Sequence, residues 1–201
     1  MNYWQKKIGI CFIKDMGKRF LLVLISLVMF AGSAFAYSNP RWFSLPISVY
    51  IPKQEEAAIV TQAFKEWQLN SKSAVRFLFR YSANLASISN INVVFVDNVS
   101  GDRPYRVNHS FSQFGTYSRG CKNTNYFYNT DVILPLQKED GEKLSKEQLK
   151  AIALQAVGVA VGVNLSEDAN SVMYKESDFT KTTLSPMDIQ AVNGVYRPTR
   201  K

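Results

Sequence analysis

The segment Leu149–Ser166 reads LKAIALQAVGVAVGVNLS and is the most informative stretch of this chain. Between Ala151 and Val163 every residue is apolar or a glycine, with the single exception of Gln155. A helix that is apolar on all sides is normally buried inside a domain. We therefore predict a buried central helix over residues 145–163, around which the rest of the domain is built.

Flanking residues mark the two ends of this helix. Ser145 is followed three residues later by Gln148, which is the spacing of a capping box and predicts the helix start. Gly158 and Gly162 lower the helix propensity of the segment. Glycine at these positions indicates close backbone packing, and at Gly162 also the helix end and a turn.

The remaining segments have the patterns of a mixed α+β domain. Four apolar residues at helical spacing predict an amphipathic helix over residues 54–70; they are Val60, Ala63, Phe64 and Trp67. Ser185 followed by Pro186 is a favoured helix start and predicts a last helix over residues 185–196. Alternating or compact apolar runs predict strands at Leu45–Ile51, Val75–Tyr81, Ile91–Val96 and Asp131–Leu136.

The order of these pieces resembles the matrixin branch of the metzincin zinc proteases. Ala63–Trp67 (AFKEW) and Phe77–Phe79 (FLF) match the early helix and strand of that family. Ser171–Tyr174 (SVMY) matches its Met-turn, and Leu184–Ile189 (LSPMDI) matches its closing helix. The resemblance spans residues 42–196. It implies an α+β metzincin-like (zincin) catalytic-domain fold, with a twisted mixed sheet of about five strands, a buried central helix and a C-terminal helix.

The resemblance also implies where the zinc motif H-E-x-x-H-x-x-G-x-x-H would lie. Its three histidine positions fall on Gln155, Val159 and Leu165, its catalytic glutamate on Ala156, and its Met-turn methionine on Met173. A zinc hydrolase needs imidazole, thiolate or carboxylate ligands and a general base. Because these residue types are missing, we expect a catalytically inactive homologue with no bound metal and no cofactor.

An active secreted metalloendopeptidase that holds zinc through unusual ligands is the alternative. The chain has one histidine, His109, and one cysteine outside the N-terminal segment, Cys121. His109 is either a surface or hydrogen-bonded residue or a structural zinc ligand of the kind found in some matrixins. Cys121 is either a bystander or a reactive thiol in basic surroundings. Gln155 is either a buried, satisfied amide or a polar contact at the floor of a cleft.

Peptide binding is the function that survives loss of the metal ligands. In matrixins the substrate lies extended along an edge strand above the metal helix, and backbone pairing of this kind needs no metal. The matching candidates here are Phe114, Gly115, Thr116, Tyr117 and Ser118. The alternative is that they form an ordinary loop. The expected partner is a protein or peptide that the sequence does not name.

The N-terminus has the features of a signal peptide, residues 1–36. Basic residues precede an apolar run, and Ala34-Phe35-Ala36 is a cleavage signal, so the single domain is expected over 37–201. Met16 is an alternative start, and an uncleaved anchor is the alternative to cleavage. The net charge of +8 falls to +4 after cleavage, because this segment holds five basic residues and one acidic residue. We expect an exported protein, secreted or periplasmic, without nucleic-acid binding or membrane association after cleavage.

Overall fold

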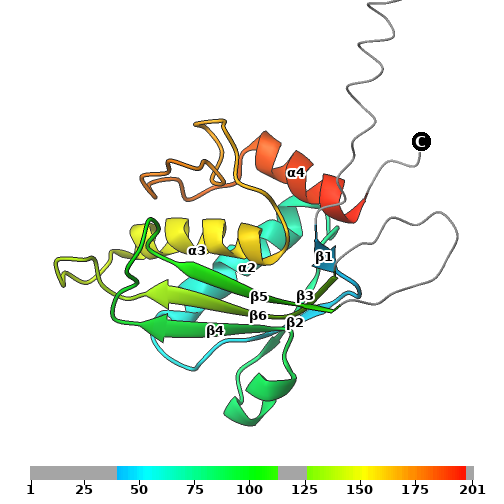
Figure 1. The fold of residues 1–201 in the computed structure, drawn as a ribbon, viewed down its shortest axis with the longest axis horizontal. Coiled ribbons are helices and arrows are strands. Elements are labelled where there is room, and N and C mark those ends of the chain that lie inside the picture. The colour runs from blue at the N-terminus through cyan, green and yellow to red at the C-terminus, as the bar shows by residue number, and fades with distance from the viewer. Residues whose placement is uncertain (1–39, 113–125, 198–201) are drawn as a thin grey trace, which may run out of the picture. The chain divides into compact units, whose positions relative to one another are not determined.

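A mixed six-stranded sheet with two long helices on one face organises the residues that the computed structural model describes, 40–112 and 126–197 (Figure 1). In chain order the elements are β1 (Arg41–Trp42), β2 (Ile47–Tyr50), α2 (Ala57–Asn70), β3 (Phe77–Arg80), the 3-10 helix η1 (Ala83–Ile88), β4 (Ile91–Val96), β5 (Arg106–Ser112), β6 (Tyr126–Pro135), α3 (Lys146–Ala160) and α4 (Pro186–Tyr196). The strand order is β3–β2–β4–β6–β5, and β1 pairs with the start of β6. Only β5 runs antiparallel. These elements belong to one compact unit, Asn39–Lys201.

The central helix α3 begins and ends where its flanking residues predict. The Ser145 hydroxyl accepts from the Gln148 amide at 3.1 Å, and the Gln148 side chain accepts from the Ser145 amide at 3.0 Å, so the capping box is confirmed. The helix ends at Ala160, and Gly162 follows with φ +88°. A Cβ at Gly162 would also collide with the Pro40 carbonyl oxygen. This turn therefore requires glycine for both its backbone angle and its space.

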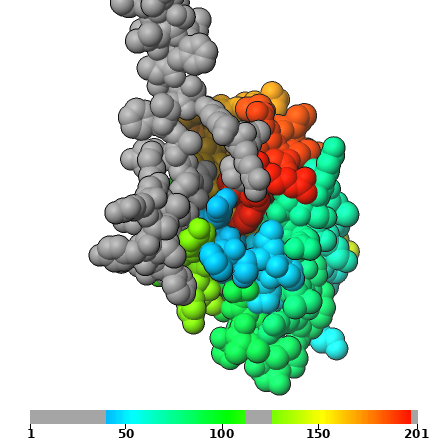
Figure 2. Space-filling model, turned by 90° about the vertical axis from the view of Figure 1, so that its right-hand side faces the viewer, coloured from blue at the N-terminus to red at the C-terminus, as the bar shows by residue number. Residues whose placement is uncertain are grey.

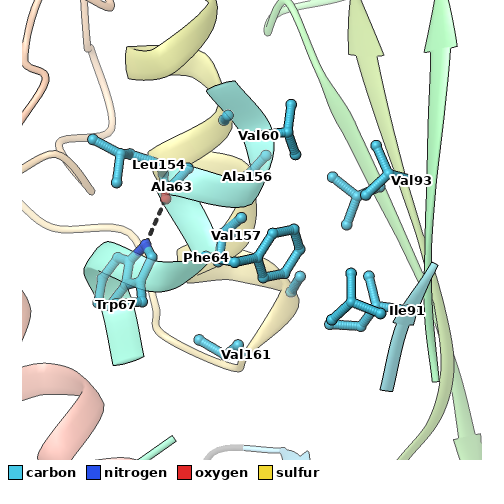
Figure 3. Packing of buried hydrophobic residues seen from close by; sticks show 14 of the residues in the cluster. Val60, Ala63, Phe64, Trp67, Ile91, Val93, Leu154, Ala156, Val157 and Val161 are labelled. Atoms are coloured by element: carbon cyan, nitrogen blue, oxygen red, sulfur yellow. Dashed lines mark hydrogen bonds between the residues drawn. The ribbon is translucent and has the colours of Figure 1, made fainter. Parts of the chain in front are cut away.

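The core lies between α3, α2 and the inner face of the sheet. Val60 and Phe64 on α2 point toward Ile91 and Val93 of the sheet (Figure 3). The Phe64 ring also packs edge-on against Phe77, with 5.0 Å between the ring centroids. Burial of apolar side chains in this core favours folding by roughly 25 cal/mol per Å² removed from water.

Two tryptophans attach α3 to its neighbours through polar as well as apolar contacts. Trp67 Nε1 on α2 donates to the Leu154 carbonyl at 2.9 Å, the bond drawn in Figure 3. Trp42 Nε1 on β1 donates to the Ala160 carbonyl at 3.0 Å. Each indole therefore buries its large ring while keeping its only donor satisfied.

A buried carboxylate joins α4 to the segment that follows α3. Asp188 is 1% exposed and accepts from the backbone amides of Ser185 at 2.8 Å and Val172 at 3.1 Å. The Ser171 hydroxyl donates to its other oxygen. At the far end of the same helix, Arg41 donates to the Val195 carbonyl at 3.0 Å, and Figure 2 shows this blue N-terminal segment beside red α4.

Several element boundaries differ from the sequence expectations. The sheet has six strands rather than about five, because β1 and β5 were not predicted, and β6 starts five residues before Asp131. The reason for missing β5 is its composition: polar residues separate Val107, His109 and Phe111, and one of these three is itself polar. The coarser expectation of an α+β domain with a mixed sheet is confirmed, as are the three helices within a few residues.

Within the described ranges, no helix is long and apolar enough to cross a membrane.

Gly158 provides a stability test of the central packing. A Cβ at Gly158 would lie 2.7 Å from Trp67 Cζ2 and would collide with Met173 Sδ. We predict that Gly158→Ala lowers the free energy of unfolding by about 2 kcal/mol, because overpacking outweighs the gain in helix propensity. Urea unfolding measures this difference.

The matched control is Gly194→Ala in α4, where a Cβ would meet no atom within 4 Å. We expect this change to stabilise the protein by about 0.5–1 kcal/mol through helix propensity alone. Equal effects of the two substitutions would contradict the packing described around Gly158.

Candidate functional site

The positions that align with the zinc motif differ widely in exposure. Gln155 and Ala156 are completely buried, Val159 on the last turn of α3 is only partly buried, and Leu165 in the following loop is 42% exposed. Met173 is 1% exposed and packs on α3 at Gly158.

The amide of Gln155 uses its full hydrogen-bonding capacity inside the protein. Its Oε1 accepts from Arg103 Nη1 at 2.8 Å and from the Tyr105 hydroxyl at 2.9 Å. Its Nε2 donates to the carbonyls of Val172 at 2.7 Å and Tyr174 at 2.9 Å. An amide has two donors and two acceptor lone pairs, and all four are used. The interpretation of Gln155 as a buried, satisfied amide is therefore confirmed, and no lone pair is left for an outside ligand.

Side chains from two loops cover this amide. Arg103 bridges them, because its Nη2 also donates to the Lys175 carbonyl at 2.9 Å. The Tyr105 ring meets Phe179 edge-on at 6.2 Å, and burial raises the pKa of the Tyr105 hydroxyl although Arg103 opposes this. Phe179 is held at φ +56°, an unfavourable backbone angle for a bulky residue. The Arg103 guanidinium and the Tyr105 hydroxyl therefore contact the Gln155 amide directly, and Phe179 packs against the Tyr105 ring.

The motif positions do not fit a zinc ion. Gln155 has no free lone pair, and the side chains of Ala156, Val159 and Leu165 have none at all. Within residues 40–112 and 126–197, no three His, Cys, Asp or Glu side chains are grouped so that they could hold a metal.

His109 lies beside the last turn of α3. Its ring stacks on Phe127 with centroids 4.0 Å apart, and its Nδ1 is 2.8 Å from the Thr130 hydroxyl. Burial lowers the pKa of the imidazole, and a hydrogen bond with the Val159 backbone opposes this effect. The interpretation of His109 as a hydrogen-bonded residue is confirmed. The fold places His109, the one histidine of the chain, next to Val159, and the sequence did not indicate this contact.

One edge strand of the described sheet is β5, which was not predicted from the sequence. The predicted peptide-binding residues, Phe114 to Ser118, and the thiol Cys121 lie outside the described residues. Within the described part of the chain, the backbone of β5 pairs only with β6, and its other edge has no backbone partner. The strand is regular from Arg106 to Ser110, and a bulge then separates Ser110 from Phe111. Alternation of Val107, His109 and Phe111 is the signal that could have identified this strand.

A pocket of about 300 Å³ opens near the start of β5, beyond the ends of β4 and β6. Six apolar residues line it: Val99, Pro104, Pro135, Leu144, Ile152 and Phe179. Crevices at the carboxyl ends of parallel strands are common ligand sites. Its volume is at the lower limit for small-molecule pockets and suits one side chain better than a whole ligand.

A second hollow, of about 350 Å³, lies between α4 and the loop after α3. Met187 and Leu165 contribute exposed apolar surface there. Its one charged lining residue is Asp188, whose two oxygens already accept hydrogen bonds from Ser171, Val172 and Ser185. The Asp188 carboxylate in this hollow is therefore already hydrogen-bonded within the protein and is not positioned to bind a ligand.

Comparison of the sequence with protein-family models and with curated proteins gave no match.

The buried amide can be tested by substitution. Gln155→Leu would remove partners from Arg103, the Tyr105 hydroxyl and two backbone carbonyls at once. Since each buried unsatisfied group costs about 1–3 kcal/mol, we predict a loss of about 3 kcal/mol or more in the free energy of unfolding. Gln190→Leu on the exposed face of α4 is the matched control, expected to change stability by about 0.5 kcal/mol or less. A small effect at Gln155 would contradict this network.

His109 predicts a pH dependence with a defined sign. Its folded pKa lies below the ordinary value of 6.5, so the folded state favours the neutral ring. The stability that this provides is present above about pH 6.5 and is lost as the pH falls through the lowered folded value. We predict that His109→Gln makes the free energy of unfolding less dependent on pH between about 7 and 5. Because the chain has one histidine, the difference between the two curves isolates this group. Parallel curves would refute the assignment.

Proposed function

We propose that this protein is an exported, catalytically inactive homologue of matrixin-like metallopeptidases that binds an extended segment of a partner protein along the free edge of β5. The observation that carries the proposal is the position of β5. It is an antiparallel edge strand, its outer backbone groups have no partner in the described part of the chain, and its His109 side chain reaches α3. The family resemblance places substrate along an edge strand above the equivalent helix.

Backbone pairing explains how binding is retained without a metal. Successive peptide groups of a strand point to opposite sides, so alternate residues of β5 offer an N–H and a C=O to an added strand. The regular part, Arg106 to Ser110, is the stretch that can continue the ladder, because bulges disrupt pairing. Such main-chain bonds give affinity, and nearby side-chain pockets give specificity.

The opposite edge of the sheet is less suited to this role. There β3 has four residues, and the Phe77 amide already donates to Gln68 Oε1 at 2.8 Å. This difference supports β5 as the binding strand and makes β3 an internal control.

Loss of catalysis is the second part of the proposal. The side chains at the motif positions supply neither metal ligands nor a general base, and Arg103, Tyr105 and Phe179 fill the space before Gln155. We expect bound peptides to remain intact and the protein to need no zinc for binding.

Hydrogen exchange with short linear peptides tests the proposal. After selection of binders from an unbiased library, amides between Arg106 and Ser110 should become protected on binding, while those of β3 should not change. Methylating the peptide's backbone nitrogens one at a time should weaken binding at every second residue, which is the period of a strand. Mass spectrometry should find the peptide uncut, with or without chelator.

Two results would contradict the proposal. Protection confined to other elements, or a three- to four-residue period in the methylation series, would exclude strand addition at β5. Cleavage of the peptide together with about one zinc per chain would instead favour the metalloendopeptidase alternative.

A further inference from the structure

We propose that the pocket beside the start of β5 receives a lysine or arginine side chain of the bound segment. The inference rests on the proposed binding of an extended peptide at β5 and adds its specificity. The two sites are adjacent in the chain, because Arg103 and Pro104 line the pocket and β5 begins at Arg106. A strand paired with β5 that continues past Arg106 therefore runs alongside the residues that precede β5, two of which line the pocket.

The walls and rim of the pocket differ in character. Most of the wall is apolar, formed in part by Ile152 of α3 and by Phe179. Three amide side chains also line it: Asn98, Gln137 and Gln148. The acidic side chains of Asp102, Glu139 and Asp178 are exposed at the rim. Lysine and arginine have the matching construction, since a long apolar stem carries a charged end group.

The two basic residues of the lining are held by other partners. Lys138 Nζ is 2.6 Å from the carboxylate of Glu142, so this cation is neutralised locally. Arg103 directs its two terminal nitrogens to Gln155 Oε1 and to the Lys175 carbonyl. Neither Lys138 nor Arg103 forms an ion pair with the three acidic side chains at the rim.

Among the described residues the rim carboxylates of Asp102, Glu139 and Asp178 form no ion pairs, although the positive charge of Lys181 acts on Asp178. Asp178 accepts from the Thr180 hydroxyl at 2.8 Å, and its hydrogen bonds with Thr180 keep the pKa of this carboxyl below its usual value. A cationic end group at the mouth would complement this charge, whereas an acidic one would be repelled.

Exposed charges act weakly, so the expected preference is moderate. One exposed ion pair at contact distance in water corresponds to about a fivefold change in affinity. We therefore expect arginine and lysine peptides to bind severalfold tighter than neutral ones, and we expect high salt to reduce this difference.

The test uses pairs of synthetic peptides that differ in one side-chain charge. Arginine is compared with citrulline, and lysine with norleucine, at each position of a linear peptide selected for binding to the exported protein. Dissociation constants are measured by fluorescence anisotropy at low and high salt. At one position the charged member of each pair should bind severalfold tighter, and Asp102→Asn or Glu139→Gln should reduce that preference.

Glu167→Gln is the matched control, because Glu167 is exposed, does not line the pocket and changes the net charge equally. It should leave the preference unchanged. If peptides protect β5 from exchange but show no charge preference, or the preference responds equally to all three substitutions, the pocket inference is wrong and strand addition stands. If no peptide protects β5, the proposed function fails and the pocket inference fails with it.

Discussion

The structure depends on the burial of one helix segment that has no polar face. From Ala151 to its end at Ala160, α3 carries a single polar side chain, Gln155, so this part needs cover from every direction, and four parts of the chain supply it. The sheet lies on one side, α2 packs through Trp67, β1 attaches through Trp42, and the segment around Met173 packs at Gly158. Small residues on α3 make these approaches possible, since a single added methyl at Gly158 would meet both Met173 and Trp67.

One polar side chain on that helix then organises the loops around it. A buried amide without partners would be costly, so Gln155 has to be met by donors and acceptors from elsewhere. Arg103 and Tyr105 come from the loop before β5, and the two acceptors come from the segment after α3. The amide therefore links segments that no strand pairing joins. One of these bonds engages Arg103, which also lines the neighbouring pocket.

The functional proposals rest on backbone groups of β5 without a pairing strand and on acidic side chains without an ion pair within the described residues. At the positions that align with the matrixin zinc motif, Gln155 is fully hydrogen-bonded, Ala156 is buried, and Val159 and Leu165 are partly exposed side chains without a lone pair. The outer backbone of β5 and the acidic rim of the pocket beside it keep unsatisfied capacity within the described residues. Backbone pairing with a side-chain pocket at one end is a common means of recognising extended peptides.

The amino-acid sequence by itself determined the elements whose signals are local. The capping boxes at Ser145 and Ser185, the turn at Gly162 and the apolar run of Ile91–Val96 need only neighbouring residues to be recognised. The residue types at Gln155, Ala156, Val159 and Leu165, the positions that align with the zinc motif, are likewise read from the sequence.

Tertiary structure alone decided which distant residues meet. His109 reaches Val159, and Arg103 reaches Gln155 across 52 positions of the chain. The edge strand β5 was missed because its alternation includes polar residues, and its role comes from pairing with β6 rather than from its composition. The pocket rim likewise combines residues from three separate loops. Contacts of this kind depend on how elements pack, which local periodicity does not encode.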